Sequence, residues 1–497
     1  MSICVFLAAV VSLSGWKGET VNFRYDYTAN AAGEAFAPAW RKVPAAFAPR
    51  AGVLRPVRYA LKPHGTEYGE SPDRVEWGGT TNLPPNGACT AVGSLSVPAD
   101  ARAGDYVFGF ADAEVRLHVA DRTLPPPSKW KYFTNDLWQN PWSVARMTKT
   151  ELWSDAHLAA CRPFLEMTAK LGAKTILTTL SDLPWDHQCY DGNYTMIRHI
   201  KHGGTGKWTF DYTVFDKWVG LSLETGNGPY IYCYSLVPWG YAVTWEDETG
   251  HPNRIEAKPG TKAFEEYWTP FLVDFREHLR RKGWLENACL SFDERNPEDL
   301  VQAVSFISRV APEFRVNAAA NIPREKFGKL KVSFYTQSFA HLNDAFFAAA
   351  RERRAKGEGV TVCYVCCGPE KPNMFPWSDP DDAFWLAVMP IAKGLDGFGR
   401  WTLNSWPKDP YADASYWHWP ARDSYLVYPD CSPTWAILQL QNGVQNGEKW
   451  SILAAEGGAR AAALEKLAVR FDVKQALRKK DGDFRGLIAD VLSELNR

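Results

Sequence analysis

The sequence predicts an α/β protein: a (β/α)8 TIM barrel, preceded by a β-sandwich domain and followed by a helical C-terminal tail. Three observations predict this fold. Period-two alternation of apolar residues fills the first part of the chain, eight apolar strand-like runs then alternate with helical segments, and only helical periodicity remains at the end. We therefore expect domains at residues 1–123, 130–455 and 456–497.

The segment from Gly18 to Val119 supports the sandwich. In Val21–Tyr27 and again in Val115–Val119, apolar and polar side chains alternate, and turns rich in Pro, Gly and Asn separate the runs. Leu124–Ser128 then reads as a stiff proline linker. The apolar run Ile3–Leu13 is interpreted as a first strand in preference to a signal peptide, because no Lys or Arg precedes it.

The barrel is predicted from eight apolar runs that fit buried parallel strands. They are Lys131–Trp138, Lys174–Leu180, Tyr230–Val237, Ala288–Phe292, Phe314–Ala319, Lys331–Thr336, Val360–Cys366 and Leu395–Leu403. Amphipathic segments lie between them, including one that we expect to begin at Thr269–Pro270 and to end at Gly283. A doubly wound sheet is the rival, but the glycine-rich run His202–Thr209 does not match a phosphate loop. From Ala459 onward the chain reads as a helical tail.

The amino-acid composition excludes several classes of function. The net charge of −1 gives no basic surface for nucleic acid, and no run reaches the length of a membrane span. The ten cysteines are scattered, and Cys363 and Cys366 form a C-x-x-C on a predicted buried strand without a second pair at zinc spacing. We therefore expect no metal and no cofactor. The 22 Trp, 20 Tyr and 26 Phe supply aromatic faces that can stack on sugars.

The most informative stretch is Ala288–Arg295. An apolar strand breaks here into Asp293, Glu294 and Arg295, and Asn296 can then cap a helix that begins at Pro297. In parallel α/β proteins the carboxyl ends of the strands are where ligands bind. The sequence therefore places two neighbouring carboxylates where a catalytic site is expected.

Polar and aromatic residues follow the other predicted strands as well. Candidate substrate-binding residues are Trp138, Asn140, Trp185, Tyr234, Trp239, Tyr335, Trp401, Asn404 and Trp406. Each of them alone could equally pack within a loop. Together with two carboxylates and no phosphate loop, they favour a neutral, hydroxylated ligand such as a glycan.

Neighbouring carboxylates fit one form of glycoside cleavage. Adjacent strand residues point to opposite faces, so Asp293 and Glu294 can reach one pocket only if the chain turns between them. Such a pair suits substrate-assisted catalysis, in which the 2-acetamido oxygen of the sugar is the nucleophile, Asp293 orients the acetamide and Glu294 is the acid and base. The alternative is structural: Asp293 caps the next helix and Arg295 pairs with Glu294.

Several motifs resemble glycoside hydrolase family 123. They are Asn135–Trp142, Asp293–Arg295, Tyr364–Pro369, Arg400–Trp406 and Tyr425–Pro429, with Trp16–Glu19 in the first domain. The resemblance implies a β-sandwich and a (β/α)8 barrel, and an exo-acting β-N-acetylgalactosaminidase that removes terminal β-linked GalNAc from a glycan substrate. It also implies that Asp293 and Glu294 match the catalytic pair, and it favours a secreted or periplasmic protein.

The chain departs from the family's pattern in places. Arg422-Asp423 stands where the resemblance leads us to expect Gly-Asp, and Asp430, Cys431 and Trp435 replace a Gly and an Arg. The start also looks clipped, since Trp16 lies close to Met1. A glycosidase for another sugar and a carbohydrate-binding protein without turnover therefore remain as alternatives.

Overall fold

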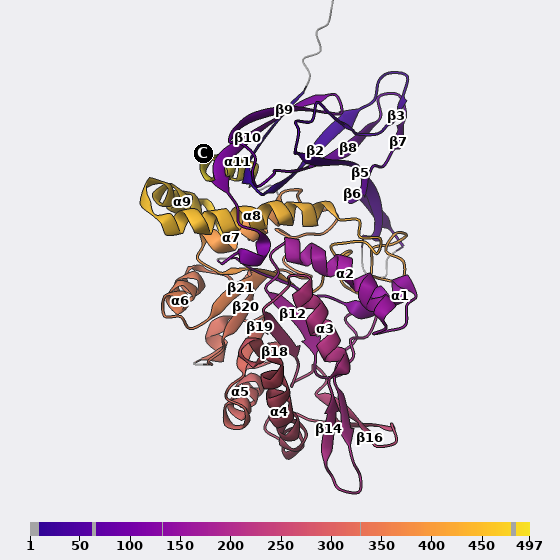
Figure 1. Cartoon of the computed structure of the whole chain (residues 1–497), viewed down its shortest axis with the longest axis vertical. Coiled ribbons are helices and arrows are strands. Elements are labelled where there is room, and N and C mark those ends of the chain that lie inside the picture. The colour runs from indigo at the N-terminus through magenta and orange to yellow at the C-terminus, as the bar shows by residue number, and fades with distance from the viewer. Residues whose placement is uncertain (1–8, 62–65, 132, 329, 479–483) are drawn as a thin grey trace, which may run out of the picture. The chain divides into compact units, whose positions relative to one another are not determined.

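The computed structural model describes residues 9–61, 66–131, 133–328, 330–478 and 484–497. The chain forms two compact units (Figure 1). Unit 1 comprises Met1–Phe133, Glu370–Ala392 and Asp409–Arg497, and unit 2 comprises Thr134–Pro369 and Lys393–Lys408. The domain limits expected from the sequence stay a prediction.

Unit 2 is built on an eight-stranded parallel sheet whose strands follow chain order. The strands are β11 (Thr134–Leu137), β12 (Thr175–Thr179), β15 (Tyr230–Tyr234), β18 (Ala288–Asp293), β19 (Arg315–Ala320), β20 (Phe334–Ser338), β21 (Val360–Tyr364) and β22 (Gly397–Arg400). β11 pairs with β22 along its length, and a single bridge from Asn135 to Ala173 links it to the start of β12. The sheet is thus a nearly closed barrel, and each of the eight predicted runs overlaps one strand, with β18, β19 and β20 extending one or two residues beyond the run.

Helices of unit 2 lie between the strands. They are α1 (Pro141–Thr148), α2 (Asp155–Lys170), α3 (Thr213–Glu224), α4 (Lys262–Lys282), α5 (Pro297–Val310) and α6 (Asp344–Ala355). The predicted start of α4 is wrong. Thr261 caps this helix by accepting a hydrogen bond from Phe264 N, and Pro270 lies inside it. The buried face of α4, from Phe264 to Leu279, keeps the helix continuous although proline cannot donate a helical hydrogen bond.

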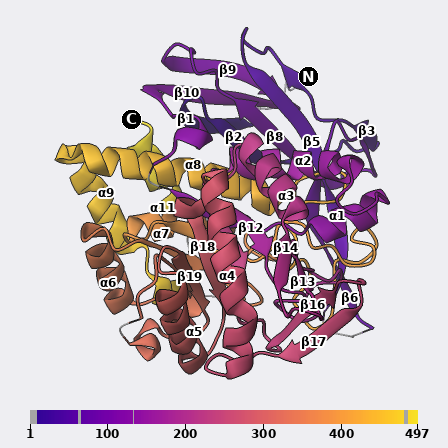
Figure 2. The same ribbon diagram turned by 60° about the horizontal axis from the view of Figure 1, so that its bottom comes forward.

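A small four-stranded extension with mixed strand pairing was not expected. Its strands are β13 (Arg198–Lys201), β14 (Trp208–Asp211), β16 (Ala242–Asp247) and β17 (Pro252–Glu256), in the order β14-β13-β16-β17. β13 pairs with β14 and β16 with β17 in antiparallel fashion, and β13 pairs with β16 in parallel. The extension belongs to the segments that follow β12 and β15, and Figure 2 shows β13, β14 and β16 side by side. His202–Thr209, rejected as a phosphate loop, contains the turn between β13 and β14.

Unit 1 contains the predicted sandwich. One sheet has the strand order β1 (Val10–Lys17), β10 (Ala113–Thr123), β9 (Gly104–Phe110) and β4 (Trp40–Arg41). The other has the order β2 (Thr20–Thr28), β8 (Ala88–Ser96), β5 (Ala48–Ala60) and β6 (Tyr68–Trp77). A further pair is formed by β3 (Glu34–Phe36) and β7 (Thr81–Leu83). Phe23, Phe108 and Phe110 lie in their common core. The first strand begins at Val10, and the earlier part of the run Ile3–Leu13 lies largely outside the described residues.

Five helices complete unit 1: α7 (Asp382–Ala392), α8 (Trp435–Glu456), α9 (Gly458–Arg470), α10 (Val473–Arg478) and α11 (Phe484–Leu495). The helical tail is therefore confirmed. The tail is bound to the sandwich, because Trp16 Nε1 donates a 2.8 Å hydrogen bond to Leu495 O. On the preceding helix α8, Lys449 Nζ lies 2.6 Å from Glu19 Oε1 in a fully buried ion pair.

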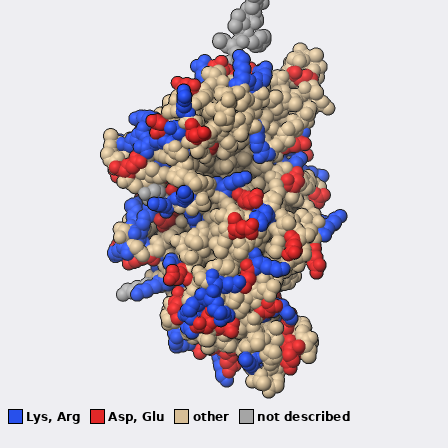
Figure 3. Space-filling model, in the orientation of Figure 1, with Lys and Arg blue, Asp and Glu red and all other residues tan. Residues whose placement is uncertain are grey.

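The surface agrees with the near-zero net charge. Lys and Arg are interspersed with Asp and Glu over the face seen in Figure 3, without a large area of one sign. No helix in the described parts of the chain combines the length and the apolar character that crossing a membrane requires.

Candidate active site

The backbone turns between the two neighbouring carboxylates. Asp293 is the last residue of β18, and Glu294 adopts a left-handed conformation with φ of +50°. Its N–H still donates a 3.0 Å hydrogen bond to Ala319 O of the neighbouring strand β19. Left-handed backbone is uncommon for a residue with a side chain and concentrates at functional sites. The turn required for both carboxylates to reach one place is therefore present.

Glu294 is held by two polar side chains from other strand ends. Tyr364, at the end of β21, donates a 2.5 Å hydrogen bond to Glu294 Oε1, and Asn321 Nδ2, just after β19, donates one of 2.8 Å to Oε2. Burial raises the pKa of Glu294, while these two hydrogen bonds act in the opposite direction. The carboxyl is thus fixed in position.

Asp293 has a different environment. Its carboxylate accepts no hydrogen bond from the residues that the structure describes, although its carbonyl oxygen accepts one of 3.1 Å from Trp239 Nε1. Burial raises the pKa of Asp293 well above its usual value, the neighbouring Glu294 raises it further, and Arg295 opposes both effects. Both carboxyl pKa values are therefore raised, and simultaneous ionisation of the two groups is disfavoured.

Five of the predicted aromatic residues gather in one cluster inside the barrel. The ring centroids of Trp138 and Trp185 lie 5.1 Å apart, and that of Tyr234 lies 4.7 Å from Trp138 and 5.2 Å from Trp185. Trp239 and Trp401 are partly buried and pack against this cluster. The ends of four strands, β11, β12, β15 and β22, thus contribute to a single aromatic cluster.

Hydrogen bonds hold two members of the cluster, Tyr234 and Trp138, in position. Asn317 Nδ2 on β19 donates a 3.0 Å hydrogen bond to Tyr234 Oη. Asp136 on β11 accepts hydrogen bonds from Thr175 Oγ1 at 2.5 Å and from Trp138 Nε1 at 3.3 Å. Burial raises the pKa of Asp136 to about 6, against the effect of those two hydrogen bonds. This buried carboxylate also raises the pKa of Asp293.

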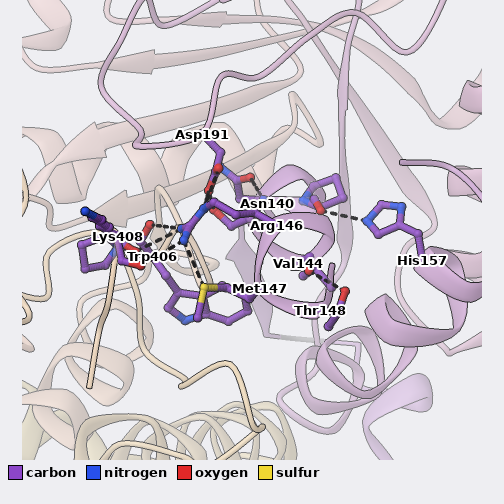
Figure 4. Close-up of polar contacts among 12 residues, drawn as sticks. Asn140, Val144, Arg146, Met147, Thr148, His157, Asp191, Trp406 and Lys408 are labelled. Atoms are coloured by element: carbon purple, nitrogen blue, oxygen red, sulfur yellow. Dashed lines mark hydrogen bonds and ion pairs between the residues drawn. The ribbon is translucent and has the colours of Figure 1, made fainter. Parts of the chain in front are cut away.

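Asn140 and Trp406 lie in a separate polar network (Figure 4), to which Asn404 belongs through its hydrogen bond with Asn140. Asn140 caps α1 by accepting a 3.0 Å hydrogen bond from Ser143 N, and its own N–H donates one of 2.7 Å to Asn404 Oδ1. The carbonyl of Trp406 accepts a 2.8 Å hydrogen bond from Arg146 Nη2, and its ring packs on Phe164 of α2. These contacts hold loops together, so the structure gives all three residues structural partners.

Tyr335 is not brought to the carboxylates. On β20 the side chain of Phe334 points into the barrel core, so Tyr335 faces outward, where its ring lies near those of Phe327 and Phe346. Its hydroxyl donates a 3.1 Å hydrogen bond to Gln337 Oε1. We therefore do not propose Tyr335 again as a substrate-binding residue.

The structural explanation for the acidic pair finds little support. Asn296, and not Asp293, caps α5 by accepting a 2.9 Å hydrogen bond from Asp299 N. Arg295 donates to Pro238 O at 3.2 Å and lies over the ring of Tyr241, and no ion pair between Arg295 and Glu294 occurs among the described residues. Both carboxyl groups are therefore available for chemistry.

The sequence analysis missed Tyr364, Asn321 and Asp136 as site residues. Tyr364 and Asn321 sit at the carboxyl ends of their strands or just beyond, which was a usable signal. Within the described residues, no group of three or more His, Cys, Asp or Glu side chains could hold a metal ion.

Comparisons with known proteins identify the family to which this chain belongs. Residues 138–453 match the model of "Glycoside hydrolase 123, catalytic domain". A solved family 123 glycoside hydrolase from Clostridium perfringens, described in a study of glycolipid glycan hydrolysis, superimposes with a TM-score of 0.86 at 22% identity, over 98% of this chain and 92% of that one.

More distant structures add nothing to the argument. The β-D-glucuronidase from Dictyoglomus thermophilum has a TM-score of 0.34 at 8% identity, over 86% of this chain and 68% of that one. No curated protein sequence matches this chain. The family match covers more than half of the sequence, so this chain is a glycosidase that belongs to glycoside hydrolase family 123.

Proposed function

We propose that this glycosidase removes terminal β-linked N-acetylgalactosamine from glycans, with the 2-acetamido oxygen of the sugar as the nucleophile. The observation that carries the proposal is the pair itself: one carboxylate without a hydrogen-bond partner among the described residues beside a second that Tyr364 and Asn321 hold in place. A single turn at Glu294 presents both from one strand end.

A further carboxylate inside the barrel, that of Asp136, is a poor nucleophile. Asp136 is 4% exposed, and Thr175 and Trp138 occupy its two oxygens. Retaining glycosidases with a protein nucleophile place two carboxyl groups about 5–5.5 Å apart across the scissile bond. Asp136 does not suit that role, because both of its carboxylate oxygens accept hydrogen bonds. Its unsuitability favours a nucleophile supplied by the substrate.

Each residue of the pair has a distinct role in this mechanism. Ionised Asp293 accepts the acetamide N–H, orients the carbonyl oxygen for attack on the anomeric carbon and offsets the positive charge of the oxazolinium ion. Protonated Glu294 donates its proton to the leaving glycosidic oxygen. As a carboxylate, it then removes a proton from the water that attacks the anomeric carbon and opens the oxazolinium ring. The second step restores the acid form of Glu294.

Substrate binding determines which of the two carboxyl groups, Asp293 or Glu294, carries the proton. Both pKa values are raised by burial, so a doubly ionised pair is unfavourable. An acetamide N–H that donates to Asp293 stabilises the ionised form of that carboxylate, and the proton then remains on Glu294. Substrate binding thereby produces the protonation state that the first step requires.

The aromatic cluster supports a sugar as the ligand. Trp239 and Trp401 are partly exposed and can offer apolar ring faces, with Trp239 hydrogen-bonded to the backbone of Asp293, while Trp138, Trp185 and Tyr234 are buried in the cluster against which they pack. Buried Trp185 Nε1 has no hydrogen-bond partner among the described residues. The Clostridium perfringens relative is described in terms of glycolipid glycans, and we extend that substrate class to this chain.

The first experiment compares turnover of an aryl β-GalNAc with that of the aryl β-galactoside, which differs only at the 2-acetamido group, and of the aryl β-GlcNAc. Cleavage of the GalNAc glycoside alone is expected. Equal cleavage of the galactoside would require a protein nucleophile, and preference for GlcNAc would assign another hexosamine. Binding of all three without released product would leave only a carbohydrate-binding protein.

A further inference from the structure

We propose that unit 1 contains a second sugar-binding site, in a cavity of about 310 Å³, which takes one neutral pyranose residue of a glycan. The cavity is lined by Arg24 on β2, Asp73 on β6, the segment before α7, Arg422 and the start of α8, all of which belong to unit 1. Its volume is at the lower end of the range for small-molecule sites, about 300–1,000 Å³, which suits a single sugar ring.

Arg422 supplies the strongest indication of a ligand. It lines the cavity at 1% exposure, its Nε lies 2.9 Å from Asp73 Oδ1 and its Nη2 donates to Met374 O. Buried Nη1 has no hydrogen-bond partner among the described residues. An unsatisfied buried guanidinium N–H is costly, and a hydroxyl oxygen of a bound sugar would satisfy it.

The backbone of Arg422 points the same way. Its φ is +60°, in the left-handed region that glycine adopts without steric cost. The chain therefore keeps an arginine in a conformation that disfavours side chains. Strain of this kind persists where the side chain has a use, and here that side chain borders the cavity.

The charges of the lining favour a neutral ligand. Arg24 and Arg422 face the cavity together with Asp73 and Asp379, so the two signs balance. A bound anion would approach two carboxylates and a bound cation would approach two guanidinium groups. A polyol offers hydroxyl groups that can both donate to the acidic side chains and accept from the basic ones.

Indole rings complete the resemblance to a sugar site. Trp377 is partly exposed at the cavity, with its ring centroid 4.9 Å from that of Tyr59, and Trp435 lies beneath the guanidinium of Arg24 at 5.6 Å. An exposed indole face is what the apolar face of a pyranose stacks against.

The test uses the full chain labelled with ¹³C at its methionine methyl groups. The sequence has six methionines, of which Met374 lines the cavity, while Met147, Met167 and Met196 belong to unit 2 and report on the barrel. The probes are the methyl β-glycosides of glucose, galactose and GalNAc, with glucuronate and glucosamine as charged counterparts. We expect a neutral glycoside to shift the Met374 signal saturably, and the charged sugars to bind at least about tenfold more weakly.

A matched pair of variants then assigns the contact. Arg422→Lys keeps a cation beside Asp73 but loses the planar Nη1 donor, and should weaken binding about tenfold. Arg50→Lys is the control, because Arg50 lies on Trp77 of the same unit outside the cavity. If Arg422→Lys unfolds, Trp377→Leu replaces it with the same expectation. Absence of a Met374 shift with every neutral sugar, equal binding of charged sugars, or unchanged affinity in the cavity variants would overturn the proposal.

Discussion

Tyr364 Oη donates a 2.5 Å hydrogen bond to Glu294 Oε1, so the end of β21 fixes a carboxyl group carried by the segment that follows β18. Two strands, β19 and β20, lie between them in the sheet. The position of the proposed acid is therefore set by the pairing of strands across the sheet as well as by its own backbone.

Removing this hydrogen bond should change the pH dependence. The bond from Tyr364 stabilises ionised Glu294 and lowers its pKa, so Tyr364→Phe should raise that pKa. The basic limb of the kcat/KM profile should move to higher pH, and kcat should fall about tenfold as the carboxyl loses its alignment. Tyr335→Phe, which alters a hydroxyl on the outer face of β20, should leave the profile unchanged. An unmoved basic limb in Tyr364→Phe would separate Tyr364 from the titrating acid.

Asp293→Asn should slow hydrolysis of an aryl β-GalNAc by about 10²–10³-fold, because the oxazolinium loses its anionic partner. The measurement is kcat under saturating substrate. Asp186→Asn, at an exposed carboxylate near the barrel end, serves as control and should be close to wild type. A wild-type rate for Asp293→Asn would remove this residue from the mechanism.

Glu294→Gln should discriminate between leaving groups. Natural glycans and alkyl glycosides need a proton on the departing oxygen, whereas an activated nitrophenyl group leaves without one. We expect the variant to lose far more activity on the alkyl glycoside than on the nitrophenyl glycoside, measured as kcat/KM for each. Similar losses on both substrates would contradict the role of general acid.

The raised pKa values also predict a stability effect. Because the folded pair binds protons more tightly than the unfolded chain, the free energy of unfolding should fall as the pH rises from the ordinary values of 3.8 and 4.5 through the raised ones. The double variant with Asp293→Asn and Glu294→Gln lacks this titration. Urea unfolding at a series of pH values should show its advantage over wild type growing with pH, and parallel curves would refute the effect.

Substitution of Asn140 should affect stability, whereas substitution of Asn321 should affect catalysis. Asn140→Ala removes the cap of α1 and should cost about 1 kcal/mol of stability, with KM unchanged. Asn321→Ala removes an exposed hydrogen bond to Glu294 and should lower kcat with little effect on unfolding. Urea unfolding and steady-state kinetics of the two variants test this contrast. A raised KM in Asn140→Ala would restore Asn140 to the substrate-binding residues.

The sequence located the barrel because buried parallel strands are short apolar runs, and all eight were found. It located the carboxylates because a strand that ends in charged residues marks the functional edge of such a sheet. Side-chain direction was harder. Tyr234 and Tyr335 both lie in apolar runs, yet Tyr234 joins the aromatic cluster and Tyr335 faces the outer side, and one residue of register decides which.

For residues beyond a strand end, the strand register does not predict the direction of the side chain. Asn140, Asn404 and Trp406 follow strands closely, but tertiary contacts direct them into the network around Arg146. The extension formed by β13, β14, β16 and β17 was also missed, because short strands within long loops carry little periodicity. The start of α4 was misplaced because proline is more common in a first helical turn than in an interior.

The adjacency of Asp293 and Glu294 in the chain has a mechanical consequence. In glycosidases whose carboxylates come from opposite strands, any change in barrel width alters the distance between the reacting groups. Here the carboxylates of Asp293 and Glu294 are attached to consecutive residues, whose α-carbons lie about 3.8 Å apart by covalent geometry. The spacing of their attachment points is therefore insensitive to breathing of the barrel, and insertions elsewhere in its loops can accumulate without separating the attachment points of the pair.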